Sequence, residues 1–143
     1  MSRALEVVGR LRKLAVNEAR RDLAACLAAE AAADAAEQAA HTGMQRERDA
    51  ARIVPVNEAG GAFAAWLPRG LQAIAAAHES ARRAVQAVTV ARTALTGARA
   101  AGEAVQKMLA REAALLAVAA SRRDQAALDE AGQRAKQHII SIS

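Results

Sequence analysis

The amino-acid sequence predicts an all-α protein, a long antiparallel two-helix coiled-coil hairpin with a short loop or helical turn at its tip. Most of the 143 residues are alanine, leucine, arginine, lysine, glutamate or glutamine, which are the strongest helix formers. Both prolines and the only phenylalanine and tryptophan lie close together near the middle of the chain, at Pro55, Phe63, Trp66 and Pro68. Two helical runs on either side of one interruption indicate a hairpin.

The first helix is expected over residues 2–54. Its apolar residues recur at steps of three and four, which is typical of an amphipathic helix. Small side chains in this stripe allow a partner helix to approach closely. Pro55 ends the helix, because the residue before a proline is disfavoured in the α conformation. The expected stripe comprises Leu5, Val8, Leu11, Ala15, Ala19, Leu23, Cys26, Ala29, Ala33, Ala36 and Ala40.

Residues 55–67 are expected to form the tip, with a possible short helix over 58–66. The pair Gly60-Gly61 weakens such a helix, because glycine loses more conformational freedom on folding than other residues. Pro68 suits the first position of a second helix. The connection is short, so antiparallel neighbouring helices are favoured. We therefore expect a single domain, a hairpin rod that has the tip at one end and both termini at the other.

The second helix is expected over residues 68–137, with a frayed tail over 138–143. The isoleucines of this tail are β-branched and disfavour a helix there. Its residues follow the strict a and d spacing of a heptad repeat. Three polar members of the repeat loosen it in the middle. The expected heptad positions begin with Leu71, Ile74, His78, Ala81, Val85, Val88, Arg92, Leu95, Arg99, Gly102, Gln106 and Leu109.

Several functional classes find no support in the sequence. The formal net charge is +5, but acidic residues interleave with basic ones, which is typical of a solvated helix face and not of a nucleic-acid-binding tract. His41, His78 and His138 have no clustered cysteines or carboxylates beside them, so no metal, cofactor or catalytic role is expected. No run of 18 strongly apolar residues occurs, and Cys26 is the single cysteine. We expect a cytoplasmic, non-enzymatic protein that works by binding other proteins.

The segment Arg122-Arg-Asp-Gln-Ala-Ala-Leu-Asp-Glu130, together with the length and the hairpin layout, resembles the FliJ family of flagellar export proteins and the YscO-type stalks of injectisomes. The resemblance implies a stalk and escort component of a type III protein export apparatus. In this family the end carrying both termini enters the hexameric export ATPase, which has its own regulator. The part toward the hairpin tip contacts the export gate in the inner membrane, and the protein also engages export chaperones. Peripheral association with the inner face of the cell membrane would follow through these partners.

The resemblance also implies candidate binding residues. The gate-facing stripe of the family has Phe, Leu, Ala and His at i, i+4, i+7 and i+11. In this chain the same spacing is found at Leu67, Leu71, Ile74 and His78. Two aromatic residues nearby are candidate anchors, because tryptophan often dominates protein interfaces. The alternatives are that His78 is a tolerated residue between the helices, that Leu71 and Ile74 are buried there, and that Trp66 plugs the end of the hairpin. The export-gate candidates are Leu67, Leu71, Ile74, His78, Phe63 and Trp66.

The candidates for binding the ATPase lie near the two termini, where basic residues, Arg20 and Arg21 among them, are expected to converge in an antiparallel hairpin. Their functional interpretation is a charged plug for the pore of the ATPase. The alternative is an ordinary solvated face. These candidates are Leu5, Arg10, Arg12, Lys13, Arg122, Arg123 and Leu128.

Three other functions remain open, and the first is the stalk of a virulence injectisome in place of a flagellar component. A phasin-like amphipathic protein that coats lipid or polyester granules would also be helical and rich in alanine. A basic nucleoid-associated coiled coil is the third, and it would bind DNA in a salt-sensitive way.

Overall fold

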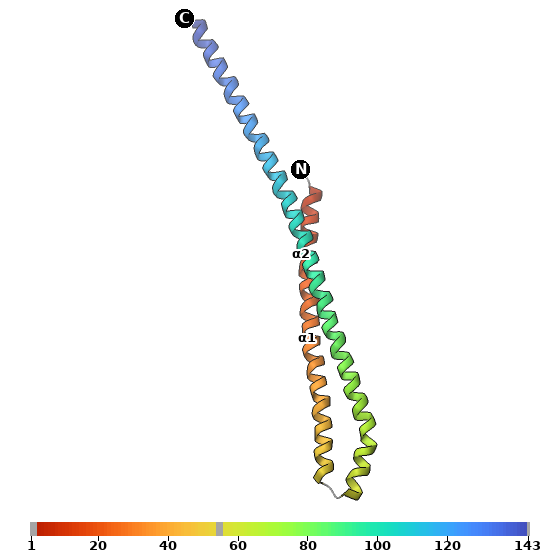
Figure 1. The fold of residues 1–143 in the computed structure, drawn as a ribbon. Coiled ribbons are helices and arrows are strands. Elements are labelled where there is room, and N and C mark those ends of the chain that lie inside the picture. The colour runs from red at the N-terminus through yellow and green to blue at the C-terminus, as the bar shows by residue number, and fades with distance from the viewer. Residues whose placement is uncertain (1–2, 54–55, 143) are drawn as a thin grey trace. The chain divides into compact units, whose positions relative to one another are not determined.

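The computed structural model describes the backbone of residues 3–53 and 56–142, and the side chains of these residues apart from 56–60. It contains two helices, α1 (Arg3–Ile53) and α2 (Val56–Ile142), which are labelled in Figure 1. The helices pack against each other as an antiparallel hairpin, which confirms the predicted all-α fold. The helix stop expected at Pro55 lies outside the described residues.

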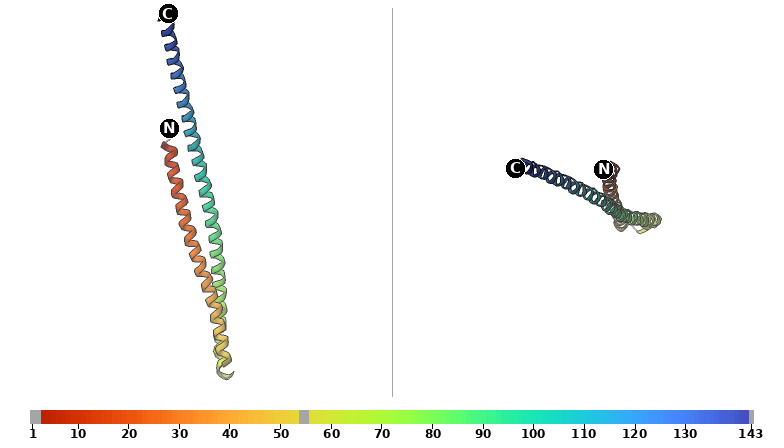
Figure 2. Two further views of the ribbon diagram at one scale, coloured as in Figure 1. Left: turned by 90° about the vertical axis from the view of Figure 1, so that its left-hand side faces the viewer. Right: turned by 90° about the horizontal axis from the view of Figure 1, so that it is seen from above.

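The residues group into two units by their contacts. The central unit is Leu14–Arg99, and the terminal unit combines Met1–Lys13 with Ala100–Ser143. In the central unit, α1 and α2 lie side by side along their length, as views from different directions show (Figure 2). Each unit is a pair of helix segments with its own buried stripe, so each has a packing of its own to explain.

The central unit is held together by a regular seam, meaning the stripe of each helix that faces the other helix. On both helices the buried and half-buried residues recur at alternating steps of three and four, the spacing of a coiled coil. Alanine predominates, and the buried members of the seam are Met44, Val88, Ala91 and Leu95. The seam comprises Val16, Ala19, Leu23, Cys26, Glu30, Ala33, Glu37, Ala40 and Met44 of α1, and Ile74, Ala77, Ala81, Ala84, Val88, Ala91, Leu95 and Ala98 of α2.

Half of the heptad positions expected on α2 are wrong by one residue. Ile74, Ala81, Val88 and Leu95 do lie in the seam, as expected. The alternate positions lie one residue earlier, because small side chains such as Ala84 let the helices approach where the larger Val85 would hold them apart. The polar members of the expected set therefore stay in water. The exposed, wrongly assigned positions are Leu71, His78, Val85, Arg92, Arg99 and Gln106.

The stripe expected on α1 also needs correction. Ala29 and Ala36 are exposed, whereas Glu30 and Glu37, one residue further along, are half-buried in the seam. The prediction favoured alanine over glutamate because isolated carboxylates are rarely buried. Their positions here are tolerated because the seam is narrow, so a long side chain rooted in it still reaches solvent.

The second helix begins and ends outside the expected range of 68–137. The structure has one helix from Val56 to Ile142, with Pro68 inside it, in place of a separate tip over 55–67 and a frayed tail from 138. A proline inside a helix removes one hydrogen bond and costs about 3 kcal/mol. An apolar stripe that continues through this proline opposes that cost, since Phe63, Trp66, Leu67 and Ile74 are all half-buried along it.

In the terminal unit the closest packing surrounds Gly9, which is buried. A Cβ atom placed at Gly9 would lie 3.5 Å from Leu109 Cδ1 and 3.6 Å from Val105 Cγ1. Leu5 is half-buried on the same face of α1, whereas Val8 and Leu11, also expected in the stripe, are exposed. Between residues 113 and 142 of α2, only Ala119 is even half-buried. The last part of α2 therefore continues as a helix with almost its whole surface open.

Candidate partner-binding surfaces

The aromatic residues near the start of α2 pack on their own helix. The rings of Phe63 and Trp66 stack with centroids 6.2 Å apart and planes inclined by 26°. Gly70 is buried because the indole of Trp66 lies over it, and a Cβ atom at Gly70 would overlap that ring. Phe63, Trp66 and Leu67 are all half-buried. A partner would therefore meet the outer edges of these side chains and not fully exposed anchors.

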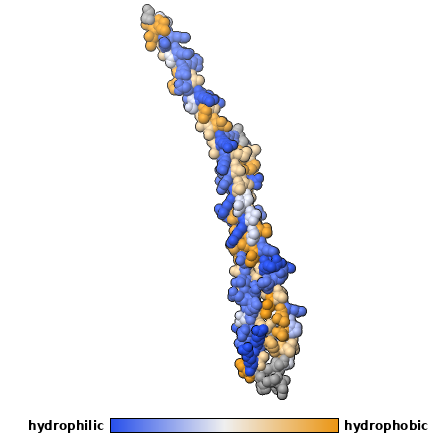
Figure 3. All heavy atoms as spheres, in the orientation of Figure 1, coloured by the Kyte–Doolittle hydropathy of each residue, from blue (hydrophilic) through white to orange (hydrophobic). Residues whose placement is uncertain are grey.

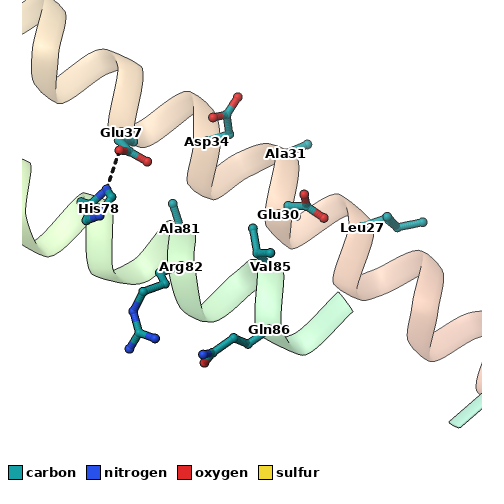
Figure 4. Close-up of a pocket in the computed structure, with 10 residues that line it drawn as sticks. All are labelled: Leu27, Glu30, Ala31, Asp34, Glu37, His78, Ala81, Arg82, Val85 and Gln86. Carbon is teal, nitrogen blue, oxygen red and sulfur yellow. Dashed lines mark hydrogen bonds and ion pairs between the residues drawn. The ribbon is translucent and has the colours of Figure 1, made fainter. Parts of the chain in front are cut away.

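The remaining gate candidates differ in exposure. Ile74 is half-buried in the seam, but Leu71 is exposed, so the expectation that both are buried is wrong for Leu71. His78 is not a buried seam residue either, since 69% of its side chain is exposed. Its Nδ1 atom forms a hydrogen bond with Glu37 Oε1 at 2.9 Å across the hairpin (Figure 4). Leu71 and His78 are thus the most accessible members of the candidate stripe.

The ATPase candidates do not converge into one cluster. Arg10, Arg12, Lys13, Arg122, Arg123 and Leu128 are all exposed, and Leu5 is half-buried. Arg12 lies beside Gly102, at 4.0 Å from the position of a Cβ atom there. Arg122 follows Gly102 by twenty residues, which is roughly 30 Å along a helix. The basic residues are therefore spread along the terminal unit.

Most of the net positive charge belongs to the terminal unit. Its 57 residues hold ten lysines and arginines against six acidic residues, a formal charge of +4. The 86 residues of the central unit hold ten basic and nine acidic residues, a charge of +1. Apolar and hydrophilic atoms alternate over the visible surface (Figure 3). Among the residues whose side chains the structure describes, eleven of the seventeen exposed large apolar ones, Leu115 and Leu128 among them, also lie in the terminal unit. A surface that is both basic and apolar suits an acidic protein partner.

Two arginines on α2 keep the carboxylate of Glu79 ionised to low pH. Arg82 donates hydrogen bonds to Glu79 at 2.7 Å and 3.0 Å, and Arg83 donates another at 3.2 Å. The hydrogen bonds from Arg82, with the positive charges of Arg82 and Arg83, lower the pKa of Glu79 to about 2.

Glu79 is therefore expected to titrate near pH 2 in the folded chain, and Arg82→Ala is expected to raise its pKa toward 4.5. Because the folded pKa is depressed, the interaction stabilises the helix above pH 4.5 and is lost as the pH falls toward 2. An NMR titration of the carboxyl carbon of Glu79 measures this. A midpoint already near 4.5 in the unaltered chain would show that the arginines do not hold it in solution.

Two further features bear on function. Within residues 3–53 and 61–142, whose side chains the structure describes, no three His, Cys, Asp or Glu side chains gather in a way that could hold a metal ion. No helix in the described part of the chain is long and apolar enough to cross a membrane.

Sequence reasoning missed two elements of these surfaces. One is Gly70, whose role under Trp66 has a weak signal in the four-residue spacing of the two. The other is the pair Glu30 and Glu37, which share the heptad frame of Leu23 and Ala33 and could have been found from that spacing.

Comparison with known proteins adds no relative, since no protein-family model, curated protein or solved structure matches this chain.

Proposed function

We propose that this protein is a non-enzymatic stalk and escort component of a bacterial flagellar, type III protein export apparatus. The observation that carries the proposal is the last part of α2. Residues 113–142 form a helix that is exposed along nearly its whole length, and they include the Arg122–Glu130 segment that resembles the FliJ family. An exposed helix of this kind is suited to entering the central opening of a ring-shaped partner.

In this proposal the terminal unit engages the hexameric export ATPase and its regulator. Its net charge of +4 would steer the helix toward an acidic opening, because complementary charge accelerates encounter and orients the partners. Exposed apolar residues such as Leu115, Leu116 and Leu128 would then supply buried area in the complex. Both properties are found together in the terminal unit, which supports assigning the ATPase to it.

The central unit would carry the contacts with the export gate and the chaperones of exported subunits. The accessible candidates there are Leu71 and His78, and the half-buried Phe63 and Trp66 precede them on α2. His78 lies twelve residues, roughly 18 Å, beyond Trp66 on the helix, so these candidates form a row along α2. A few exposed side chains in such a row suit a transient contact, as expected of an escort that must release its cargo.

The test is stimulation of the cognate export ATPase by the purified chain. Arg122→Glu/Arg123→Glu is expected to reduce the stimulation at least tenfold, since both arginines are exposed and both reversals oppose the proposed acidic opening. Arg46→Glu/Arg48→Glu is the control, a pair of exposed arginines in the central unit. The proposal fails if the unaltered chain neither binds nor stimulates the ATPase, or if both double variants lose activity equally.

A further inference from the structure

A groove runs along one side of the central unit between α1 and α2. Its volume is about 620 Å³, and most of its lining is apolar. Leu27 and Val85 are 41% and 52% exposed, although both are large apolar side chains, and Ala31 and Ala81 also line the groove (Figure 4). The groove therefore offers an apolar surface that the hairpin itself leaves uncovered.

One wall of this groove is acidic. Glu30, Asp34 and Glu37 of α1 line it, and within the described residues Glu30 forms no hydrogen bond or ion pair. Figure 4 shows Arg82 on the opposite wall directed away from α1, and its guanidinium is held by Glu79 at 2.7 Å. Between Arg21 and Arg46, α1 has four acidic residues and no lysine or arginine. Glu37 contacts His78 at 2.9 Å, and Asp34 accepts a hydrogen bond from Gln38 at 3.3 Å, but neither contact involves a lysine or arginine.

The complementary surface is present in the same protein. The first turns of α1, residues 3–13, carry Arg3, Arg10, Arg12 and Lys13 against the single acidic residue Glu6. Val7 and Leu11 are exposed there, on a different face of the helix from Leu5 and Gly9, which pack toward α2. This segment therefore keeps a second apolar face, edged by arginines, while the hairpin is closed.

The spacing of the charges matches. Glu30 and Glu37 are seven residues apart on α1, and Arg3 and Arg10 are also seven residues apart, which is about 10.5 Å along a helix in both cases. Val7 lies between the two arginines, where it would face the apolar floor of the groove. Two ion pairs and the burial of Val7 and Leu11 can therefore form in one register.

We propose that the groove of the central unit binds residues 3–13 of a second copy of this chain. The contact joins different surfaces of the two copies, so it leaves a free groove and a free segment at the ends of each assembly. Self-association is then concentration-dependent and can extend beyond a dimer. The inference goes beyond the proposed export function and does not depend on it, because no other protein takes part.

Sedimentation velocity of the full chain over a range of concentrations tests this. The expected result is self-association at low ionic strength that weakens as salt is added, because salt screens exposed ion pairs. Glu30→Lys/Glu37→Lys and Arg3→Glu/Arg10→Glu are each expected to weaken association at least tenfold. An equimolar mixture of the two variants is expected to form a complex again, since the reversed groove then faces the reversed segment.

The control is Glu47→Lys/Asp49→Lys, which reverses two exposed acidic residues on α1 outside the groove and is expected to leave association unchanged. Circular dichroism of each variant establishes that the helices persist, and Leu27→Ser provides a groove variant without a charge change. The proposal is overturned if the chain stays monomeric at low salt, if the groove variants associate like the control, or if the mixture does not form a complex. Binding of a foreign basic helix by a chain that never self-associates would likewise overturn it.

Discussion

Val88→Asn is expected to destabilise the hairpin by about 3 kcal/mol more than Val90→Asn does. Val88 is 4% exposed in the seam, whereas Val90, two residues away on the same helix, is 68% exposed. Losing a buried valine removes about 1.5–2 kcal/mol of hydrophobic stabilisation. The buried amide that replaces it lacks partners among the alanines of the seam, which costs about 1–3 kcal/mol.

The two variants differ in burial but not in helix propensity, because both replace valine with asparagine inside one uninterrupted helix. Urea unfolding followed by circular dichroism measures both free energies. A difference of this size is a large part of the 5–15 kcal/mol that stabilises small domains. Equal losses from the two substitutions would contradict the position of the seam on α2.

The seam explains how much of the fold could be predicted. Helix-forming composition and one cluster of prolines and aromatics were sufficient for a two-helix hairpin. The repeat through Ile74, Val88 and Leu95 was also correctly found, since these bulky residues have no apolar rival at the same spacing. The companion positions were not found, because Val85 and Ala84 are neighbours and hydrophobicity alone favours the larger. Ala84 lies in the seam because the small residues of the facing helix let α1 and α2 approach closely, and the sequence of α2 alone does not contain that information.

The beginning of α2 was missed for a related reason. Pro68 is a strong local signal for the first turn of a helix, and Gly60-Gly61 weakens the residues before it. Half-burial of Phe63, Trp66 and Leu67 opposes both effects. The contacts that the structure shows for the two aromatic rings lie within α2, where Phe63 stacks on Trp66 and Trp66 covers Gly70. Side-chain contacts along the same helix therefore oppose local propensity in the first turns of α2.

The candidate surfaces likewise include a part that the sequence predicts and a part that depends on how the helices face each other. Exposure of Arg122 and Arg123 follows from their charge, which the sequence shows directly, whereas exposure of Leu128 follows from its place beyond the paired part of α2. The acidic wall of the groove depends on which residues of α1 turn toward α2. That rotation is fixed by seven-residue spacing across the whole central unit, where one displaced residue exchanges Ala29 for Glu30 and Ala36 for Glu37.

Gly70→Ala is expected to destabilise the protein by about 1–2 kcal/mol, although glycine-to-alanine changes usually stabilise helices. A methyl group at Gly70 would overlap the indole of Trp66, so the ring must leave the helix surface and lose part of its buried area. Nothing lies within 4 Å of a methyl group at Gly97, so Gly97→Ala is expected to stabilise by up to about 1 kcal/mol. The same chemical change therefore has opposite signs at two positions of α2.

Trp66 is the single tryptophan, so its fluorescence reports on the same event. Gly70→Ala is expected to shift the emission to longer wavelength as the ring enters water, while Gly97→Ala leaves it unchanged. A double-mutant cycle completes the argument, because in a Trp66→Ala background the ring is gone and Gly70→Ala should become stabilising. If Gly70→Ala still destabilises without the indole, the ring does not lie over this glycine. If the coupling is found, Trp66 is held against its own helix before any partner arrives, and the tip presents a preorganised surface.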